Sequence, residues 1–84
     1  MTVLAVFRSR SQTIDFLSRL QRYGVTVQAV NTPKEAKIGC GLSAKFNFNA
    51  LAQAKFILRN TKYSSFVGLY TWENRMGRQV FTSI

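Results

Sequence analysis

Short apolar runs separated by turn residues predict four β-strands. The first of these runs, TVLAVF, is β-branched and continuous, which is typical of a strand buried on both faces. The predicted strands are Thr2–Phe7, Val25–Val30, Leu42–Phe46 and Ser65–Trp72. After them, Asn74–Gly77 has turn character and Gln79–Ile84 alternates between polar and apolar positions. We therefore predict a final hairpin strand that pairs with the fourth.

Two further segments have apolar residues at helical spacing. The inner face of the first predicted helix consists of Ile14, Leu17 and Leu20, with Phe16 and Tyr23 beside them. Ser9 or Ser11 serves as its N-cap, Gln12 stands at capping-box spacing from Ser9, and Gly24 is typical of the residue that ends a helix. The second predicted helix is Ala50–Arg59, capped by Asn47 or Asn49, with inner residues Leu51, Ala54, Ile57 and Leu58.

This order of elements, βαββαβ, predicts an α+β fold of the ferredoxin-like type. In this two-layer sandwich an antiparallel sheet of order 4-1-3-2 carries both helices on one face. We expect one domain over residues 1–84, in which 1–72 form the βαββαβ core and 73–84 a C-terminal hairpin or tail with a fifth strand.

The topology also predicts which distant residues meet. The end of the first strand and the starts of the third and fourth strands lie at the same edge of such a sheet. The chain's only cysteine, Cys40, directly precedes the third strand. We therefore expect Cys40 to lie near the first turn of the first helix, beside Arg8, Ser9 and Arg10.

The charge is strongly positive, with 12 Lys and Arg against 3 Asp and Glu and a formal net charge of +9. Such a field attracts polyanions and acidic proteins, although here the cations are spread along the whole chain. No apolar run is long enough for a signal peptide or a membrane span, so we expect no membrane partner and a cytoplasmic location. One cysteine cannot form an internal disulfide, which agrees with a reducing compartment.

The residue inventory excludes most enzyme mechanisms. The chain has no histidine, so a Cys-His nucleophile pair is excluded. One cysteine and three scattered acids cannot build a zinc site within one chain, and no phosphate-binding glycine loop is present. We expect neither a metal nor a cofactor, and we do not expect a self-sufficient enzyme.

The remaining candidate for chemistry is the thiol of Cys40, set between Gly39 and Gly41. The N-terminus of the first helix and the cations Arg8, Arg10, Lys34 and Lys37 would all favour its thiolate. Flanking glycines would leave room for a reaction partner. The alternative is that Cys40 is a small apolar filler at a turn, because free cysteine is among the most often buried residue types.

The segment around Cys40 resembles the motif of a small bacterial family, the selenium/sulfur carrier-like proteins. The matching residues are Pro33-Lys34-Glu35, then Cys40-Gly41-Leu42, and then Phe46 at the end of a strand. The resemblance covers about residues 2–72. It implies that the Cys40 thiol carries sulfur or selenium, which a donor protein supplies and an acceptor protein receives.

Two departures from the family pattern matter. Lys34 stands where arginine is expected, and lysine loses bidentate anion binding. The extension Glu73–Ile84 is longer than the usual end of the family, which allows an additional role such as pairing between subunits.

Two other functions fit the same sequence. A basic ferredoxin-like sheet can bind RNA by stacking bases on exposed aromatic residues, here Phe7, Phe46, Phe66, Tyr70 and Trp72, although the RNP1 motif of such proteins is absent. Alternatively the chain is a structural module that forms a homodimer through the open face of the sheet or the tail strand.

Overall fold

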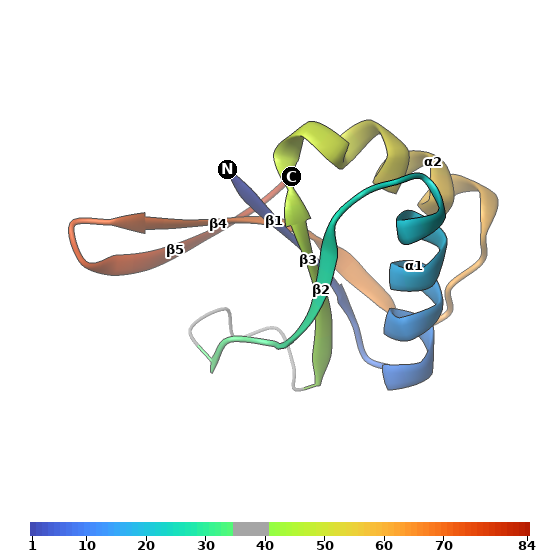
Figure 1. The fold of residues 1–84 in the computed structure, drawn as a ribbon. Helices are drawn as coiled ribbons and strands as arrows, with labels where there is room; N and C mark the ends of the chain where they lie inside the picture. Colours follow the sequence, from blue (N-terminus) through green and yellow to red (C-terminus); the bar gives the residue numbers. More distant parts are fainter. Residues whose placement is uncertain (35–40) are drawn as a thin grey trace.

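The computed structural model describes residues 1–34 and 41–84, and in this part of the chain five strands form one sheet with two helices on one face (Figure 1). The elements are β1 (Thr2–Phe7), α1 (Arg10–Arg22), β2 (Val27–Asn31), β3 (Leu42–Asn47), α2 (Leu51–Asn60), β4 (Phe66–Arg75) and β5 (Arg78–Ser83). A short 3₁₀ turn, Phe48–Ala50, leads into α2.

The sheet has the order β2-β3-β1-β4-β5, and all neighbouring strands are antiparallel. Read from β4 to β2, the first four strands have the predicted ferredoxin-like order, and β5 is added beside β4. The predicted α+β sandwich and its fifth strand are therefore confirmed. A β-bulge lies where β4 meets the end of β1, between Val6 and Phe7.

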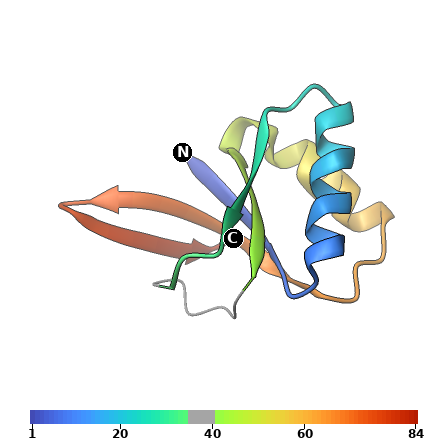
Figure 2. The same cartoon turned by 60° about the horizontal axis from the view of Figure 1, so that its bottom comes forward.

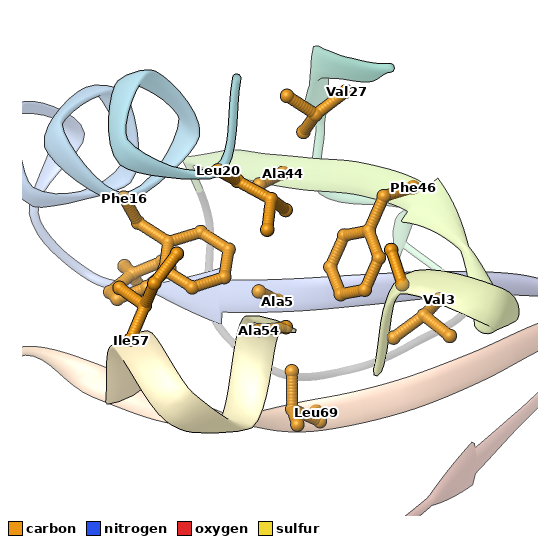
Figure 3. Close-up of a cluster of buried hydrophobic side chains, with 12 residues drawn as sticks. Val3, Ala5, Phe16, Leu20, Val27, Ala44, Phe46, Ala54, Ile57 and Leu69 are labelled. Carbon is orange, nitrogen blue, oxygen red and sulfur yellow. The ribbon is translucent and has the colours of Figure 1, made fainter. Parts of the chain in front are cut away.

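The hydrophobic core lies between the sheet and the two helices (Figure 3). From β1, the alternating residues Val3, Ala5 and Phe7 face the helices, and each is at most 1% exposed. Phe16 of α1 fills the centre, with its ring centroid 5.4 Å from that of Phe7 and 6.3 Å from that of Phe46. The other face of β1 is equally buried at Leu4 and Val6, as the continuous apolar run predicted.

Helix α1 begins and ends where the sequence predicted. Ser9 is its N-cap, and the Ser9 hydroxyl accepts a hydrogen bond from the backbone N–H of Gln12. Gly24 follows the C-cap with a φ of +79°, the left-handed conformation that ends many helices. The reciprocal half of a capping box is not formed, because the Gln12 side chain bonds to Ser64 and Ser65 instead of to the Ser9 backbone.

The predicted inner face of α1 was wrong at two positions. Ile14 is 45% exposed and Tyr23 is 53% exposed, while Thr13, Phe16 and Leu20 are fully buried. The buried stripe begins at Thr13, whose hydroxyl finds polar partners inside, at the carbonyls of Ser9 and Leu42. A search for apolar residues alone therefore places the stripe about one residue too late.

The hairpin of β4 and β5 projects well beyond the rest of the sheet, as both views show (Figures 1 and 2). The strand β4 continues to Arg75, three residues past the predicted end at Trp72, because Asn74 and Arg75 pair with Gln79 and Arg78 of β5. Smaller shifts affect β2, which begins at Val27, and α2, which begins at Leu51.

Candidate functional site

The predicted site falls partly outside the described residues. Lys37, Gly39 and Cys40 belong to the undescribed segment 35–40, so the placement of the thiol stays a prediction. The segments on either side, Thr32–Lys34 and Gly41–Leu42, are described, and they locate the two ends between which Cys40 lies in the sequence.

The two ends are joined at the last rung between β2 and β3. The backbone N–H of Thr32 donates to the carbonyl of Gly41 at 2.8 Å. The Thr32 hydroxyl is also hydrogen bonded to the hydroxyl of Ser43, which is fully buried. Both anchors of the Cys40 segment are therefore held by the sheet itself.

The start of β3 lies against the first turn of α1. The buried hydroxyl of Thr13 donates to the carbonyl of Leu42 at 2.9 Å. Gly41 passes the end of β1 closely, since a Cβ on Gly41 would lie 3.9 Å from the carbonyl oxygen of Phe7. The predicted meeting of the end of the first strand with the start of the third is thus present in the residues next to Cys40.

The predicted supporting residues Arg8, Ser9 and Arg10 form the connection between β1 and α1. Arg8 and Arg10 are exposed, and Ser9 is half-buried as the N-cap. The first intrahelical hydrogen bond of α1 runs from Thr13 N–H to Ser9 C=O, so the N–H groups of Arg10 and Ser11 have no partner within the helix. The positive end of the helix dipole therefore faces the same edge of the sheet as these two cations.

Of the two remaining described members of the predicted site, Lys34 is exposed and Pro33 is half-buried. Both follow β2 at the end of the sheet where the Thr32–Gly41 hydrogen bond lies. The described residues thus bring Arg8, Ser9, Arg10 and Gly41 to one edge of the fold.

Sequence reasoning missed a polar network that fixes this edge. The backbone N–H of Ser9 donates to the Ser65 hydroxyl at 3.0 Å, and the Ser65 hydroxyl and N–H both donate to the Gln12 side-chain oxygen, at 2.7 and 2.9 Å. The Arg8 N–H also donates to the Ser65 carbonyl at 2.9 Å. The network ties the start of α1 to the start of β4, and the only sequence signal for it was Gln12 at capping-box spacing.

The aromatic residues named for base stacking separate into two groups. Phe7 and Phe46 are 1% and 3% exposed, and both belong to the core beneath the helices, so they are unable to stack on a base. Phe66 is 37% exposed and packs beside Phe7. Tyr70 and Trp72 are half-buried on the opposite face of the sheet.

Among the residues that the structure describes, no cluster of acidic, cysteine or histidine side chains could hold a metal ion. In the same residues no helix is long and apolar enough to cross a membrane.

Comparison with known proteins gives one match. The model of a family described as "Putative Se/S carrier protein-like" matches residues 2–67, which include the whole Cys40 segment and end two residues into β4. No curated protein and no solved structure matches the chain. The match covers more than half of the chain, and the hairpin formed by the rest of β4 and by β5 lies outside it.

Proposed function

Because the chain belongs to the Se/S carrier protein-like family, we propose that it is a thiol carrier, which holds sulfur or selenium on Cys40 and passes it between partner proteins. The observation that carries the proposal is the family match over residues 2–67, which contain the only cysteine of the chain. A carrier needs a nucleophilic thiol, but it needs neither a general base nor a metal.

The proposed transfer is an exchange at sulfur. The Cys40 thiolate attacks the outer sulfur of a persulfide on the donor protein, a new sulfur–sulfur bond forms, and the donor's own sulfur–sulfur bond breaks. The donor leaves as a thiolate, Cys40 becomes the persulfide, and no external oxidant or reductant is needed. Delivery repeats the step with the acceptor as nucleophile and Cys40 as leaving thiolate. Selenium in place of the outer sulfur follows the same course.

The electrostatics of the described residues support a thiolate at this edge. Gly41, the residue after Cys40, lies beside the carbonyl of Phe7, and the exposed Arg8 and Arg10 follow directly in the chain. Cations and the N-terminus of α1 lower the pKa of a nearby thiol, and they also stabilise Cys40 as leaving group. The net charge of +9 suits docking to acidic donor or acceptor proteins, and we expect this exchange to take place in the reducing cytoplasm.

The first test is the alkylation rate of Cys40 as a function of pH, together with the intact mass of the protein as purified. We expect a thiol pKa well below the ordinary value of about 8.5 and, after incubation with a persulfide donor, an adduct of about +32 Da that is absent from Cys40→Ser. A thiol that reacts slowly, with a raised pKa and no adduct, would assign Cys40 to packing and overturn the proposal.

A matched pair of variants tests the electrostatic support. Arg10→Gln removes a cation from the first turn of α1, and Arg22→Gln makes the same change in its last turn, about 18 Å away along the helix. We expect Arg10→Gln to raise the pKa of Cys40 and to slow alkylation at neutral pH. Arg22→Gln should leave both unchanged. Equal effects of the two variants would mean that only the overall charge matters.

A further inference from the structure

Among the described strand residues, the face of the sheet opposite the helices, here called the open face, is almost free of charge. Strand register assigns to it the residues Thr2, Leu4, Val6, Gln28, Val30, Ser43, Lys45, Asn47, Gly68, Tyr70, Trp72, Asn74, Gln79, Phe81 and Ser83. Within the five strands, all of which the structure describes, Lys45 is the only charged residue on this face. In a chain with a net charge of +9, such a surface is unusual.

The same face presents an aromatic surface. Leu4 and Val6 are at most 1% exposed, and the Tyr70 ring lies over Gly68, where an added Cβ would be 3.3 Å from the ring. Val30, Tyr70, Trp72 and Phe81 are each only partly covered. These four partly covered side chains, and not the buried Leu4 and Val6, form the apolar surface that the face offers to a partner. The projecting β4–β5 hairpin extends this face beyond the helices (Figure 1).

This surface is poorly suited to a nucleic acid. The Trp72 ring is stacked on Phe81 with the centroids 5.6 Å apart and the planes at 24°, and Lys45 Nζ lies 5.4 Å from the Trp72 ring centroid. The side chains of Lys45 and Phe81 thus already occupy positions that a stacking base would need. Phosphate groups would meet one cation, while single-strand binding relies on a positively charged groove.

The charge distribution allows a partner with the same charge as this chain to bind at this face. Arg19, Arg22, Lys55 and Arg59 lie on the two helices, behind the sheet. The shortest extent of the molecule is 19 Å, whereas the screening length at physiological salt is about 8 Å. Two copies that meet through their open faces would therefore keep these helix cations apart by more than a screening length.

We propose that this open face is the interface of a homodimer, in which two copies pack sheet against sheet about a two-fold axis. Five strands about 4.8 Å apart and six residues long form a face of roughly 24 by 20 Å. A standard interface takes about 800 Å² of accessible surface from each partner, more than this flat area of roughly 480 Å². The interface therefore needs the whole face, including the aromatic part on β4 and β5, and lies at the small end of the range for stable dimers. In this arrangement Trp72 and Phe81 become buried, Lys45 lies at the interface above the Trp72 ring, and the cations of the two helices point outwards.

The test is the oligomeric state of three variants of the full chain, measured by sedimentation equilibrium. Gln28→Lys and Ser83→Lys place a cation on the open face at β2 and β5, and Gln53→Lys makes the same change as Gln28→Lys on the exposed side of α2. We expect a dimer for the wild type and for Gln53→Lys, and dissociation constants raised at least about tenfold for the other two variants, because like charges then oppose one another. The emission of Trp72, the only tryptophan, should shift to longer wavelength as the wild type dissociates on dilution.

Three results would overturn the proposal. The first is a wild type that is monomeric at every concentration measured. The second is a dimer that Gln28→Lys and Ser83→Lys weaken no more than Gln53→Lys does, which would place the interface elsewhere. The third is a monomer that binds single-stranded oligouridylate more tightly after Gln28→Lys, which would assign the face to nucleic acid. Circular dichroism of each variant verifies that the sheet is intact.

Discussion

At the scale of single residues, the backbone of Gly41, next to Cys40 in the sequence, limits substitution. Its φ of +132° lies in a region that residues with side chains rarely adopt. A Cβ added there would lie 3.9 Å from the carbonyl oxygen of Phe7, which is an ordinary van der Waals contact and not a clash. The strain of Gly41→Ala is therefore in the backbone, and we expect a loss of about 1–3 kcal/mol in the free energy of unfolding. Guanidinium titration measures it. A loss below about 0.5 kcal/mol, typical of surface substitutions, would contradict this assignment.

A second residue-scale prediction concerns Tyr63, whose hydroxyl donates to the Asp15 carboxylate at 2.6 Å. Burial, and next the bond to Asp15, raise the pKa of Tyr63 to about 12. The folded state therefore holds this proton more tightly than the unfolded state, and the stabilisation is complete below pH 10 and lost as the pH rises towards 12. Tyr63→Phe removes the titrating hydroxyl, so its contribution to the fall of the free energy of unfolding between pH 10 and about 12 should disappear. An absorbance titration of tyrosinate should lose the ionisation near pH 12.

Asp15 provides the complementary measurement. The hydrogen bonds from Tyr63 and then Arg19 lower the pKa of its carboxyl group, which is half exposed. In Tyr63→Phe this pKa should rise towards 3.8, as followed by the carboxyl carbon shift in NMR. Because the folded-state pKa is lowered, the associated stability is present above the ordinary pKa and is lost as the pH falls through the lowered one. An unchanged Asp15 pKa would mean that Arg19 alone sets it.

The sequence predicted the role of single residues correctly where the pattern that marks the role lies within a few neighbouring positions. Gly24, and Ser9 as one of two candidate N-caps beside Ser11, were predicted because an N-cap and a left-handed C-terminal residue leave marks within a few positions. The bond between Gln12 and Ser65 joins residues 53 positions apart, so no local pattern reveals it. The geometry of Cys40 stays a prediction, because the segment 35–40 lies outside the described residues.

At the scale of elements, Thr13 connects α1 to the start of β3. Its side chain is fully buried, and its hydroxyl lies 2.9 Å from the carbonyl of Leu42. Thr13→Val keeps the shape but leaves that carbonyl without this donor, so we expect a loss of about 1–3 kcal/mol in the free energy of unfolding. The exposed Thr26 supplies the control, since Thr26→Val should change stability by less than about 0.5 kcal/mol. Equal effects of the two variants would show that the Thr13 hydroxyl has no structural role.

At this scale the sequence predicted the type and order of the helices and strands correctly. It predicted their buried faces and their end residues less accurately. The strand β1 and the helix α1 stood out because their apolar patterns are long and their ends are marked. The buried stripe of α1 was misjudged at Ile14, since the polar Thr13 takes the buried position at the start of the helix. The end of β4 was placed too early because residues Asn74 and Arg75 are polar, and they are held as a strand only by pairing with β5.

At the scale of the whole molecule, the buried core and strand β5 lie in different parts of the chain. Every residue of the buried hydrophobic cluster precedes position 70, the last of them being Leu69, and the family match ends at residue 67. The strand β5 is at the edge of the sheet, and among the described strands it pairs only with β4. The stack of Phe81 on Trp72 belongs to this pairing. The two-layer core should therefore fold without β5.

The last prediction follows from this separation. A chain that ends at Arg75 lacks β5 but keeps α1, α2 and the first four strands. We expect it to retain the far-ultraviolet circular dichroism of the helices and a cooperative guanidinium transition, with a lower midpoint because the Trp72–Phe81 stack, worth about 0.5–1.5 kcal/mol, is lost. If β5 completes the open face, the shortened chain should also be monomeric. Met76→Ala in the full chain is the control, since Met76 is fully exposed at the hairpin turn and its loss should leave the midpoint unchanged. An unfolded shortened chain would mean that the hairpin belongs to the cooperative unit, and that its pairing with β4 stabilises β1 at the centre of the sheet.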